Sequence, residues 1–306
     1  MKRLTDWLVY LVVRIFVCIV QAMRLETCHA VARVLAYIAC DVIRLRHTVV
    51  DDNIRHVYAE LGPDDRRAFA RRMWEHLFLM VCEIAHAPRK IHETNWRRFV
   101  RVHGKRTAVR YLLETRPVIL VSGHFGNFEI TSYMLGLFGF PSYTIARRLD
   151  NPYLDRYLNG FRSAYGQFIL PKEGSSAQID SVLRSGGAIA LLGDQSAGPK
   201  GCWVDFLGRP ASCHKAVALF TLLGRAPLLV SFGKRIGGPL EIEMGVYAVA
   251  DPEVGGNELA GVKSLTQWYN DRLEEIIRTA PEQYWWVHRR WKGQPPQKHT
   301  AAKRAA

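Results

Sequence analysis

Cysteine is scarce in this sequence and follows no pattern that binds a metal or builds a disulfide framework. The six cysteines stand apart from one another, and none belongs to a Cys-x-x-Cys pair. Scattered thiols are typical of a reducing compartment and make a structural zinc or a disulfide scaffold unexpected. We therefore expect a cytoplasmic location, no metal and no other cofactor.

Acidic residues are also under-represented. The 306 residues include 28 Asp and Glu against 42 Lys and Arg, which gives a formal net charge of +14. A basic protein attracts polyanions, among them nucleic acids, anionic membranes and acidic proteins or substrates. The sequence has no helix-turn-helix, zinc-finger or RNA-binding signature. We therefore expect an anionic membrane surface or acidic partner and no nucleic acid, although a basic nucleic-acid-binding protein stays a distant alternative.

Long apolar runs are rare, and the most prominent one lies near the N-terminus. Residues 7–23 are almost wholly apolar apart from Arg14. This length is close to the lower limit of about 17 residues for a membrane-spanning helix, and an arginine at the bilayer centre costs roughly 2.5–3.5 kcal/mol. A second apolar periodic stretch covers residues 31–42. Either a single span or a helix lying in the interface fits this pattern.

The flanks of this run favour membrane attachment. No small-x-small cleavage site follows it, as a secretory signal would require, and Lys2 and Arg3 would keep the N-terminus in the cytoplasm. A helix buried in a soluble core is the other alternative. We expect residues 1–45 to attach the protein to a membrane, residues 46–292 to form the main domain, and residues 293–306 to be a disordered basic tail.

The main domain alternates between apolar runs and amphipathic stretches. Such alternation predicts an α/β fold with a mostly parallel sheet flanked by helices. Predicted strands are 118–121, 142–146, 188–192 and 228–232, and an edge hairpin joins the last to 240–246. Predicted helices are 63–86, 128–137, 153–165, 176–184, 215–223 and 262–278.

The first predicted strand leads into Ser122-Gly123, followed by His124 and Glu129. On a straight helix, side chains five positions apart diverge by about 140°, so these two meet only if the backbone turns between them. Gly123 and Gly126 permit such a turn. A histidine held by a carboxylate is a general base suited to neutral pH. The alternative is a histidine at a strand end and an unrelated surface glutamate.

The pair His124-x4-Glu129 resembles the H-x4-(D/E) motif of glycerolipid and lipid A acyltransferases. Four further segments, in the same order as in the family, resemble the late lipid A biosynthesis acyltransferases: Arg147–Pro152, Leu192–Gln195, Gly201–Ala211 and Ala280–Lys292. The resemblance covers roughly residues 45–292. It implies a glycerolipid-acyltransferase-like α/β fold and an enzyme anchored at the cytoplasmic face of the bacterial inner membrane.

The resemblance also implies a reaction and its partners. A fatty acyl chain would pass directly from acyl carrier protein, or from acyl-coenzyme A, to a hydroxyl of a lipid A precursor. No serine or cysteine lies in a Gly-x-Ser-x-Gly elbow. The partners would be the acidic carrier protein, an anionic lipid acceptor and the membrane surface. Another acceptor, such as a lysophospholipid, glycolipid or aminolipid, and a non-catalytic lipid-binding relative stay open.

The resemblance assigns His124 as general base and Glu129 as the carboxylate that fixes its tautomer. The carboxyl ends of parallel strands share one edge of a sheet, so polar residues that follow them are expected to converge there. Expected oxyanion or substrate contacts are Arg147, Asn127, Asp194, Gln195, Arg289 and Arg290, together with backbone N–H groups of residues 123–126.

Several of these residues have structural alternatives. For Arg147 the alternative is a surface salt bridge with Asp150 or Asp155, and for Asp194 it is a helix N-cap. The family often has Asp-Gln-Asp where this chain has Asp194-Gln195-Ser196, so the third acidic contact is missing. The arginines of the C-terminal segment bind phosphate groups or pack that segment onto the sheet. We expect His214 to be structural.

Overall fold

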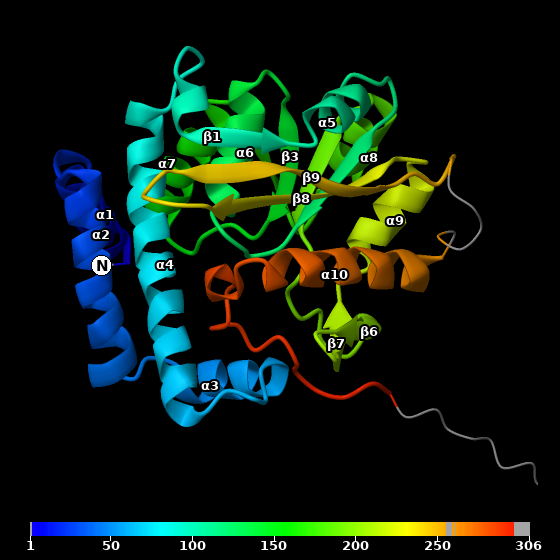
Figure 1. Ribbon diagram of the computed structural model, residues 1–306. Coiled ribbons are helices and arrows are strands. Elements are labelled where there is room, and N and C mark those ends of the chain that lie inside the picture. The colour runs from blue at the N-terminus through cyan, green and yellow to red at the C-terminus, as the bar shows by residue number, and fades with distance from the viewer. Residues whose placement is uncertain (1, 255–258, 260, 297–306) are drawn as a thin grey trace, which may run out of the picture.

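The computed structural model describes residues 2–254, 259 and 261–296. A seven-stranded sheet forms its centre (Figure 1). In spatial order the strands are β1 (Val100–His103), β9 (Ile242–Ala250), β8 (Leu228–Arg235), β2 (Val118–Ser122), β5 (Ala188–Leu192), β3 (Ser142–Ala146) and β4 (Gln167–Pro171). The five strands from β8 to β4 are parallel, whereas β9 and β1 run the opposite way.

The predicted α/β fold and its four central strands are confirmed. The predicted hairpin also exists, as the antiparallel pair β8 and β9. Its placement at the sheet edge is wrong, because β1 pairs with the outer side of β9 from Val100↔Ile242 to His103↔Gly245. The structure also adds β1 and β4 to the sheet. Both are short: β1 alternates apolar and polar residues, and the apolar run of β4 begins only after Gln167.

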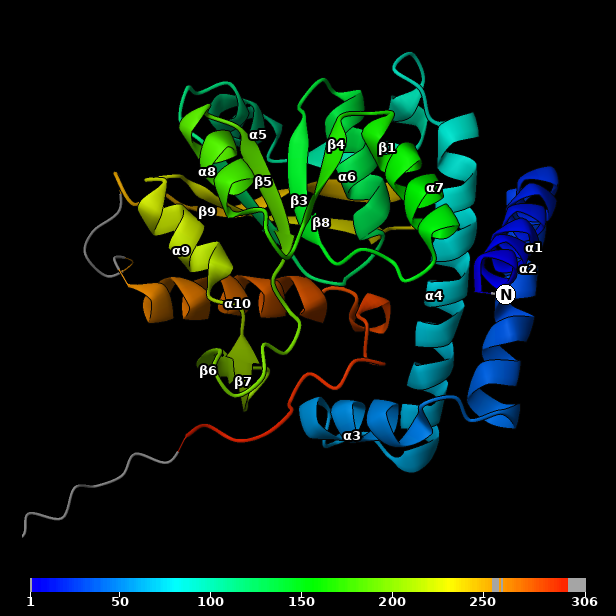
Figure 2. The same cartoon turned by 180° about the vertical axis from the view of Figure 1, so that it is seen from behind.

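Helices cover both faces of the sheet, which explains why residues 118–121 of β2 are all apolar rather than alternating. On one face, Val118 and Leu120 pack toward α5 (Lys105–Leu112) and α6 (Phe128–Leu137). On the other face, Ile119 and Val121 join a core with α8 (Ser176–Arg184), α9 (Ala216–Leu223) and α10 (Val262–Arg278). The helix α6 contacts β3 and β4, and α7 (Pro152–Ser163) contacts β4 at the side of the sheet that faces α4 (Figure 2).

A small hairpin and the C-terminal segment lie beyond one end of the sheet. The hairpin, β6 (Cys202–Phe206) and β7 (Arg209–Cys213), is antiparallel and packs against α10 (Figure 1). After α10 the chain makes a 3-10 turn, η4 (Pro281–Gln283), and runs past the hairpin. The predicted tail of residues 293–306 lies from residue 297 onward outside the described residues.

The N-terminal part is helical. It comprises α1 (Lys2–Ala22), α2 (Leu25–Tyr37), the π-helical turn η1 (Ile38–Val42), α3 (His47–Val57) and the long α4 (Pro63–Lys90); the 3-10 turn η2 (Trp96–Arg98) then leads to β1. Both α1 and α2 pack against α4 (Figure 1). The helix α1 is long and apolar enough to cross a membrane, and Val20 is its one buried residue. Its exposed large apolar side chains are Leu4, Trp7, Leu8, Val9, Leu11, Val12, Ile15, Phe16 and Ile19.

Candidate active site

Two loops at the carboxyl edge of the sheet bring His124 and Asp194 together. β2 and β5 are parallel neighbours, and the Gly193 N–H donates to the Ser122 carbonyl at 2.8 Å just beyond them. The Nδ1 atom of His124 lies 2.7 Å from Oδ1 of Asp194. The backbone N–H of His124 donates to Oδ2 of the same carboxylate at 2.7 Å. Asp194 therefore fixes both the ring and the backbone of His124.

Each member of the His124–Asp194 pair favours the charged form of the other. Burial alone would lower the pKa of His124, but the Asp194 carboxylate outweighs it and raises that pKa above its ordinary value. Burial would likewise raise the pKa of Asp194, but His124 and its two hydrogen bonds lower it. Asp194 is thus an ionised acceptor near neutral pH. The neutral imidazole then carries its proton on Nδ1 and leaves Nε2 free to accept a proton.

Gln195 lies on the reactive side of the imidazole. Its Nε2 is 3.2 Å from Nε2 of His124, so the amide donates to the nitrogen that would take a proton. The sequence placed Asp194 and Gln195 at the site, and the structure brings both to His124. The alternative that Asp194 caps a helix is wrong, because it lies in a loop that leads to β6 and no helix begins there.

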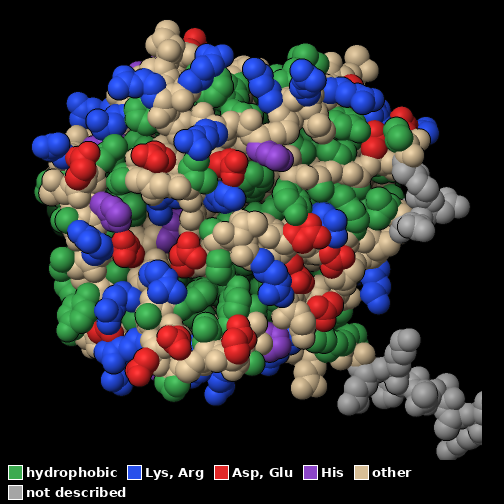
Figure 3. All heavy atoms as spheres, viewed as in Figure 1, with side chains coloured by type: hydrophobic (Ala, Val, Ile, Leu, Met, Phe, Trp, Pro, Cys, Tyr) green, Lys and Arg blue, Asp and Glu red, His purple; other side chains and the backbone are tan. Residues whose placement is uncertain are grey.

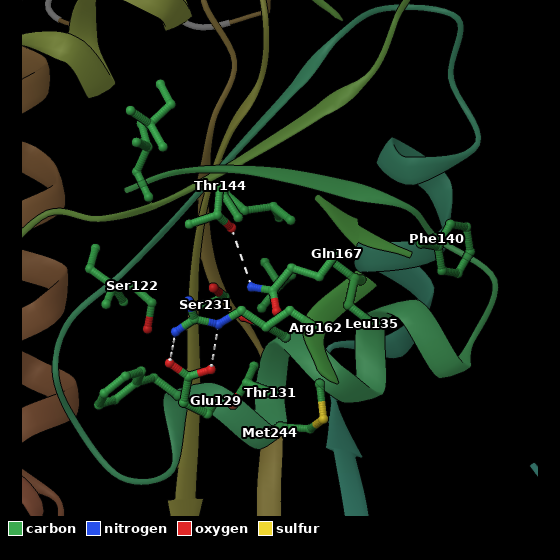
Figure 4. A pocket seen from close by; sticks show the side chains of 18 of the residues that line it. Ser122, Glu129, Thr131, Leu135, Phe140, Thr144, Arg162, Gln167, Ser231 and Met244 are labelled. Atoms are coloured by element: carbon green, nitrogen blue, oxygen red, sulfur yellow. Dashed lines mark hydrogen bonds and ion pairs between the residues drawn. The ribbon is translucent and has the colours of Figure 1, made fainter. Parts of the chain in front are cut away.

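The sequence predicted that Glu129 holds the imidazole of His124. The structure contradicts this prediction. Glu129 lies in the first turn of α6, and its carboxylate accepts both Nε, at 3.1 Å, and Nη2 of Arg162 from α7 (Figure 4). A guanidinium offers two parallel donors to a carboxylate, which a single imidazole N–H does not. Glu129 and Arg162 line the same cavity as His124. Glu129 still favours the charged imidazole through space, but less than Asp194 does.

Asn127 is not available to a substrate, contrary to the prediction. It is fully buried and caps α6, with Oδ1 accepting the Ile130 N–H at 3.2 Å. Its amide Nδ2 donates to Oε2 of Glu83 at 2.9 Å. The predicted oxyanion N–H groups are partly engaged too, because the His124 N–H binds Asp194 and the Gly126 N–H binds the Gln283 carbonyl. Gln195 is the predicted donor that lies nearest to the reactive nitrogen.

The three predicted arginines lie in different surroundings. Arg147 lines the cavity, is 79% exposed and pairs with Asp150 at 2.9 Å. Arg290 is only 1% exposed, and it donates to the Ser212 carbonyl at 2.8 Å and to Sγ of Cys213 at 2.7 Å. Its predicted role in binding substrate is wrong, because its terminal nitrogens are buried against protein atoms. Arg289 is exposed beside a separate hollow near α3.

The C-terminal segment contributes residues to the site that sequence reasoning did not assign. The Trp285 N–H donates to the His124 carbonyl at 3.0 Å, and the indole packs edge-on against the imidazole with ring centres 5.0 Å apart. Burial and the negative charge of Asp194 together raise the pKa of the Tyr284 hydroxyl, which therefore stays neutral beside the pair. His288 accepts the Ser196 N–H at 3.2 Å. The signature of aromatic residues was visible in the sequence, but its distance from His124 along the chain hid these contacts.

A cavity of about 790 Å³ opens beside His124. Most of its wall is apolar and lies between the sheet and the helices α5 and α6; it includes Ala108, Leu112, Leu120, Leu135, Phe138 and Phe140. Figure 4 shows Phe140 and Leu135 on the opposite side of the cavity from Ser122 and Glu129. One polar pair also lines it, with Gln167 donating to Oγ1 of Thr144 at 3.3 Å. Such a space suits a long hydrocarbon chain more than a polar ligand.

A histidine paired with a buried aspartate lines this apolar cavity on an α/β sheet, which is the arrangement expected of an enzyme that acts on a molecule with a long apolar chain. The chain belongs to the bacterial lipid A biosynthesis acyltransferase family, whose model matches residues 1–293. It is therefore an acyltransferase, and the family resemblance of its motifs is confirmed.

Two relatives from Escherichia coli (strain K12) are similar over most of their length. The lipid A biosynthesis lauroyltransferase is 23% identical over 267 residues, which cover 85% of this chain and 84% of that protein. The lipid A biosynthesis palmitoleoyltransferase is 22% identical and covers 83% of this chain and 81% of its own length. The crystal structure of a 1-acyl-sn-glycerophosphate acyltransferase from Thermotoga maritima aligns with 88% of this chain and 100% of its own, at 13% identity and a TM-score of 0.40.

Proposed function

We propose that the protein transfers a fatty acyl chain from an acyl thioester to a hydroxyl of a lipid A precursor, with His124 as general base. The observation that carries this proposal is the imidazole of His124, held by Asp194 at the mouth of a 790 Å³ apolar cavity. The names of both Escherichia coli relatives support lipid A as the acceptor class. The donor is acyl carrier protein or acyl-coenzyme A.

The reaction proceeds by direct transfer. The acceptor hydroxyl displaces the Gln195 amide from Nε2 of His124 and attacks the thioester carbonyl, while its proton passes to Nε2. Asp194 stabilises the imidazolium that results, and the tetrahedral intermediate carries a negative oxygen. When the intermediate collapses, the carbon–sulfur bond breaks. The thiolate takes the proton from His124, which returns the base to its neutral form and releases an ester and a thiol.

We assign Gln195 as a donor to the oxyanion. Its amide lies 3.2 Å from Nε2 of His124, so it sits beside the point at which the carbonyl must be attacked. An oxyanion donor acts only when charge develops on the oxygen, and its removal therefore slows the chemical step. The ion pair of Glu129 and Arg162 lines the same cavity as His124, and we assign it to orienting the acceptor.

Cationic side chains at the mouth fit anionic substrates. Arg147 and Lys172 both line the cavity and both are exposed, so they are placed to meet a phosphate of the acceptor or of the donor's phosphopantetheine arm. Arg289 stays a candidate for a second phosphate contact. Lys and Arg side chains also gather along the upper edge of the face in Figure 3, over β1 and α5. The exposed cationic residues of η2, β1 and α5 are Arg97, Arg98, Arg101, Lys105, Arg106 and Arg110.

We further propose that residues 1–45 attach the enzyme to the cytoplasmic face of the inner membrane, so that residues 46–292 act on lipid at that surface. The exposed apolar side chains of α1 support this assignment, since a row of this size is costly in water. Contacts with α7 keep α1 against the body of the enzyme. Asn151 donates to the Asp6 carbonyl at 2.8 Å, and the Arg14 guanidinium lies 4.7 Å from the ring centre of Tyr157.

The test is transfer of labelled acyl groups from acyl carrier protein and from acyl-coenzyme A to a diphosphorylated lipid A precursor in detergent. We expect product with wild type and none with His124→Ala. His103→Ala is the control, because His103 is an exposed histidine of β1 outside the cavity lining. A folded His124→Ala variant with near wild-type turnover would contradict the mechanism. Product only with lysophospholipid, glycolipid or aminolipid acceptors would contradict the assigned acceptor and keep the reaction class.

A further inference from the structure

The backbone turn between His124 and α6 is held by hydrogen bonds on several sides. Gly126 has a φ of +57°, and a Cβ at this position would lie 1.9 Å from the Gly233 carbonyl oxygen. The Gly126 N–H donates to the Gln283 carbonyl at 2.9 Å, and the Asn127 N–H donates to the Gly233 carbonyl at 2.7 Å. This turn determines where His124 and the first residues of α6 point.

The Gly126 carbonyl is bound by a buried histidine from α4. Nε2 of His76 lies 3.2 Å from the Gly126 carbonyl oxygen, and Nδ1 lies 2.9 Å from Nη1 of Arg235. Burial, helped by the positive charge of Arg235, lowers the pKa of His76 to about 3. The ring is therefore neutral at physiological pH. Since Arg235 only donates, Nδ1 accepts and the proton is on Nε2, which donates to Gly126.

A buried ion pair supports this histidine. Glu83, two turns along α4 from His76, is fully buried. Its Oε1 accepts Nε of Arg235 at 2.6 Å and the Leu240 N–H at 2.9 Å. Its Oε2 accepts Nη2 of Arg235 at 2.7 Å and the Asn127 amide at 2.9 Å. All four acceptor positions of the carboxylate are thus filled, and one of them holds the residue that follows Gly126.

We propose that His76 is a positioning residue for the reaction: together with the Glu83–Arg235 pair, it holds the Gly126–Asn127 turn so that the imidazole of His124 faces the attacked carbonyl. This inference rests on the proposed function. A buried ion pair often adds little net stability, because desolvation offsets its attraction. Here its bonds run outward from α4 to the catalytic turn and to β8, which a pair serving only to pack α4 would not need.

The same helix offers a matched control. His86 is also buried on α4, but it contacts Cys28 of α2, with Nε2 3.7 Å from Sγ, and has no bond to the catalytic turn. His76→Leu and His86→Leu therefore each remove one buried imidazole from α4. Only the first removes a donor from the Gly126 carbonyl. His76→Gln retains an amide donor for that carbonyl and serves as the rescue variant.

The experiment combines amide hydrogen exchange with steady-state kinetics on the full chain in detergent. We expect His76→Leu to speed exchange in peptides covering 124–130 relative to peptides covering β2, and to lower kcat by roughly 10- to 100-fold with little change in KM. His76→Gln should recover most of both losses, and His86→Leu should change neither. Exchange is measured without substrate. It therefore tests whether His76 holds the Gly126–Asn127 turn even if wild type transfers to none of the acceptors tried.

Two results would overturn the inference. In the first, folded His76→Leu exchanges over 124–130 as wild type does, which means that the turn holds its shape without the histidine. In the second, exchange in His76→Leu speeds up, but its kcat either stays at the wild-type value or falls no further than that of His86→Leu. Either finding means that the bond from His76 to Gly126 does not control the rate. If wild type shows no transfer and exchange behaves as expected, the proposed function is wrong, but His76 still holds the Gly126–Asn127 turn.

Discussion

Nδ1 of His124 lies 2.7 Å from Oδ1 of Asp194, a residue 70 positions further along the chain. The carboxylate that is hydrogen-bonded to the imidazole therefore belongs to Asp194 in the loop after β5. It does not come from the His-x4-Glu motif that marks the site in the sequence. Glu129 of that motif binds Arg162 instead. The two carboxylates therefore differ in their surroundings: Asp194 is the main group that raises the pKa of His124, and Glu129 lines the cavity in an ion pair with Arg162.

The first prediction concerns the dependence of rate on pH. His124 must be neutral to act as base, so the rate rises as pH rises through its pKa. Asp194 is the main group that raises this pKa, and Glu129 contributes less. Asp194→Asn should therefore move the acidic limb of the kcat profile to lower pH and lower its plateau by about 10³- to 10⁴-fold. Glu129→Gln should leave the position of that limb close to wild type. The reverse pattern would assign the imidazole to Glu129.

Much of the fold followed from local patterns. The helices Phe128–Leu137 and Val262–Arg278 begin and end where apolar periodicity and glycine signals placed them. The strand β2 was visible as a run of four apolar residues, because helices cover both its faces. The strands β1 and β7 escaped notice, since each has four or five residues and includes an arginine.

The site depended on contacts that no local pattern encodes. Asp194 reaches His124 because β5 pairs with β2, and strand order is set by the packing of the whole domain. Arg162 was hidden among the polar residues of a mixed helix. Glu83 offered a faint signal as a carboxylate among Met80, Val81, Cys82 and Ile84 on α4. Its role becomes clear only in the structure, where Glu83 is buried and forms an ion pair with Arg235 of β8.

The second prediction concerns Gln195. Gln195→Leu removes the amide that lies 3.2 Å from Nε2 of His124, and kcat should fall by about 10²-fold while KM changes little. Gln195→Glu should be equally slow, because a carboxylate accepts hydrogen bonds and cannot donate to an oxyanion. Gln178→Leu, at an exposed position on α8, is the control. An unchanged kcat in both Gln195 variants would remove this residue from the oxyanion site.

The third prediction concerns acyl-chain length. Leu135 lines the cavity one to two turns beyond Glu129 on α6, so Leu135→Trp should shorten the space for the chain. Each methylene that no longer fits should cost about 0.8 kcal/mol, or about fourfold in kcat/KM. Competition between donors of different length measures this change. Leu113→Trp, on a residue 70% exposed at the end of α5, should leave the preference unchanged. Equal shifts in both variants would mean that the chain lies elsewhere.

The fourth prediction distinguishes packing from substrate binding at two adjacent arginines. Arg290 is 1% exposed and satisfies the Ser212 carbonyl and Cys213, so Arg290→Ala should lower the free energy of unfolding by about 2–5 kcal/mol. Arg289→Ala, at an exposed position, should change it by less than about 0.5 kcal/mol. Urea unfolding in detergent measures both. If Arg290→Ala instead keeps its stability and raises KM for the anionic acceptor, Arg290 reaches the substrate and the packing account is wrong.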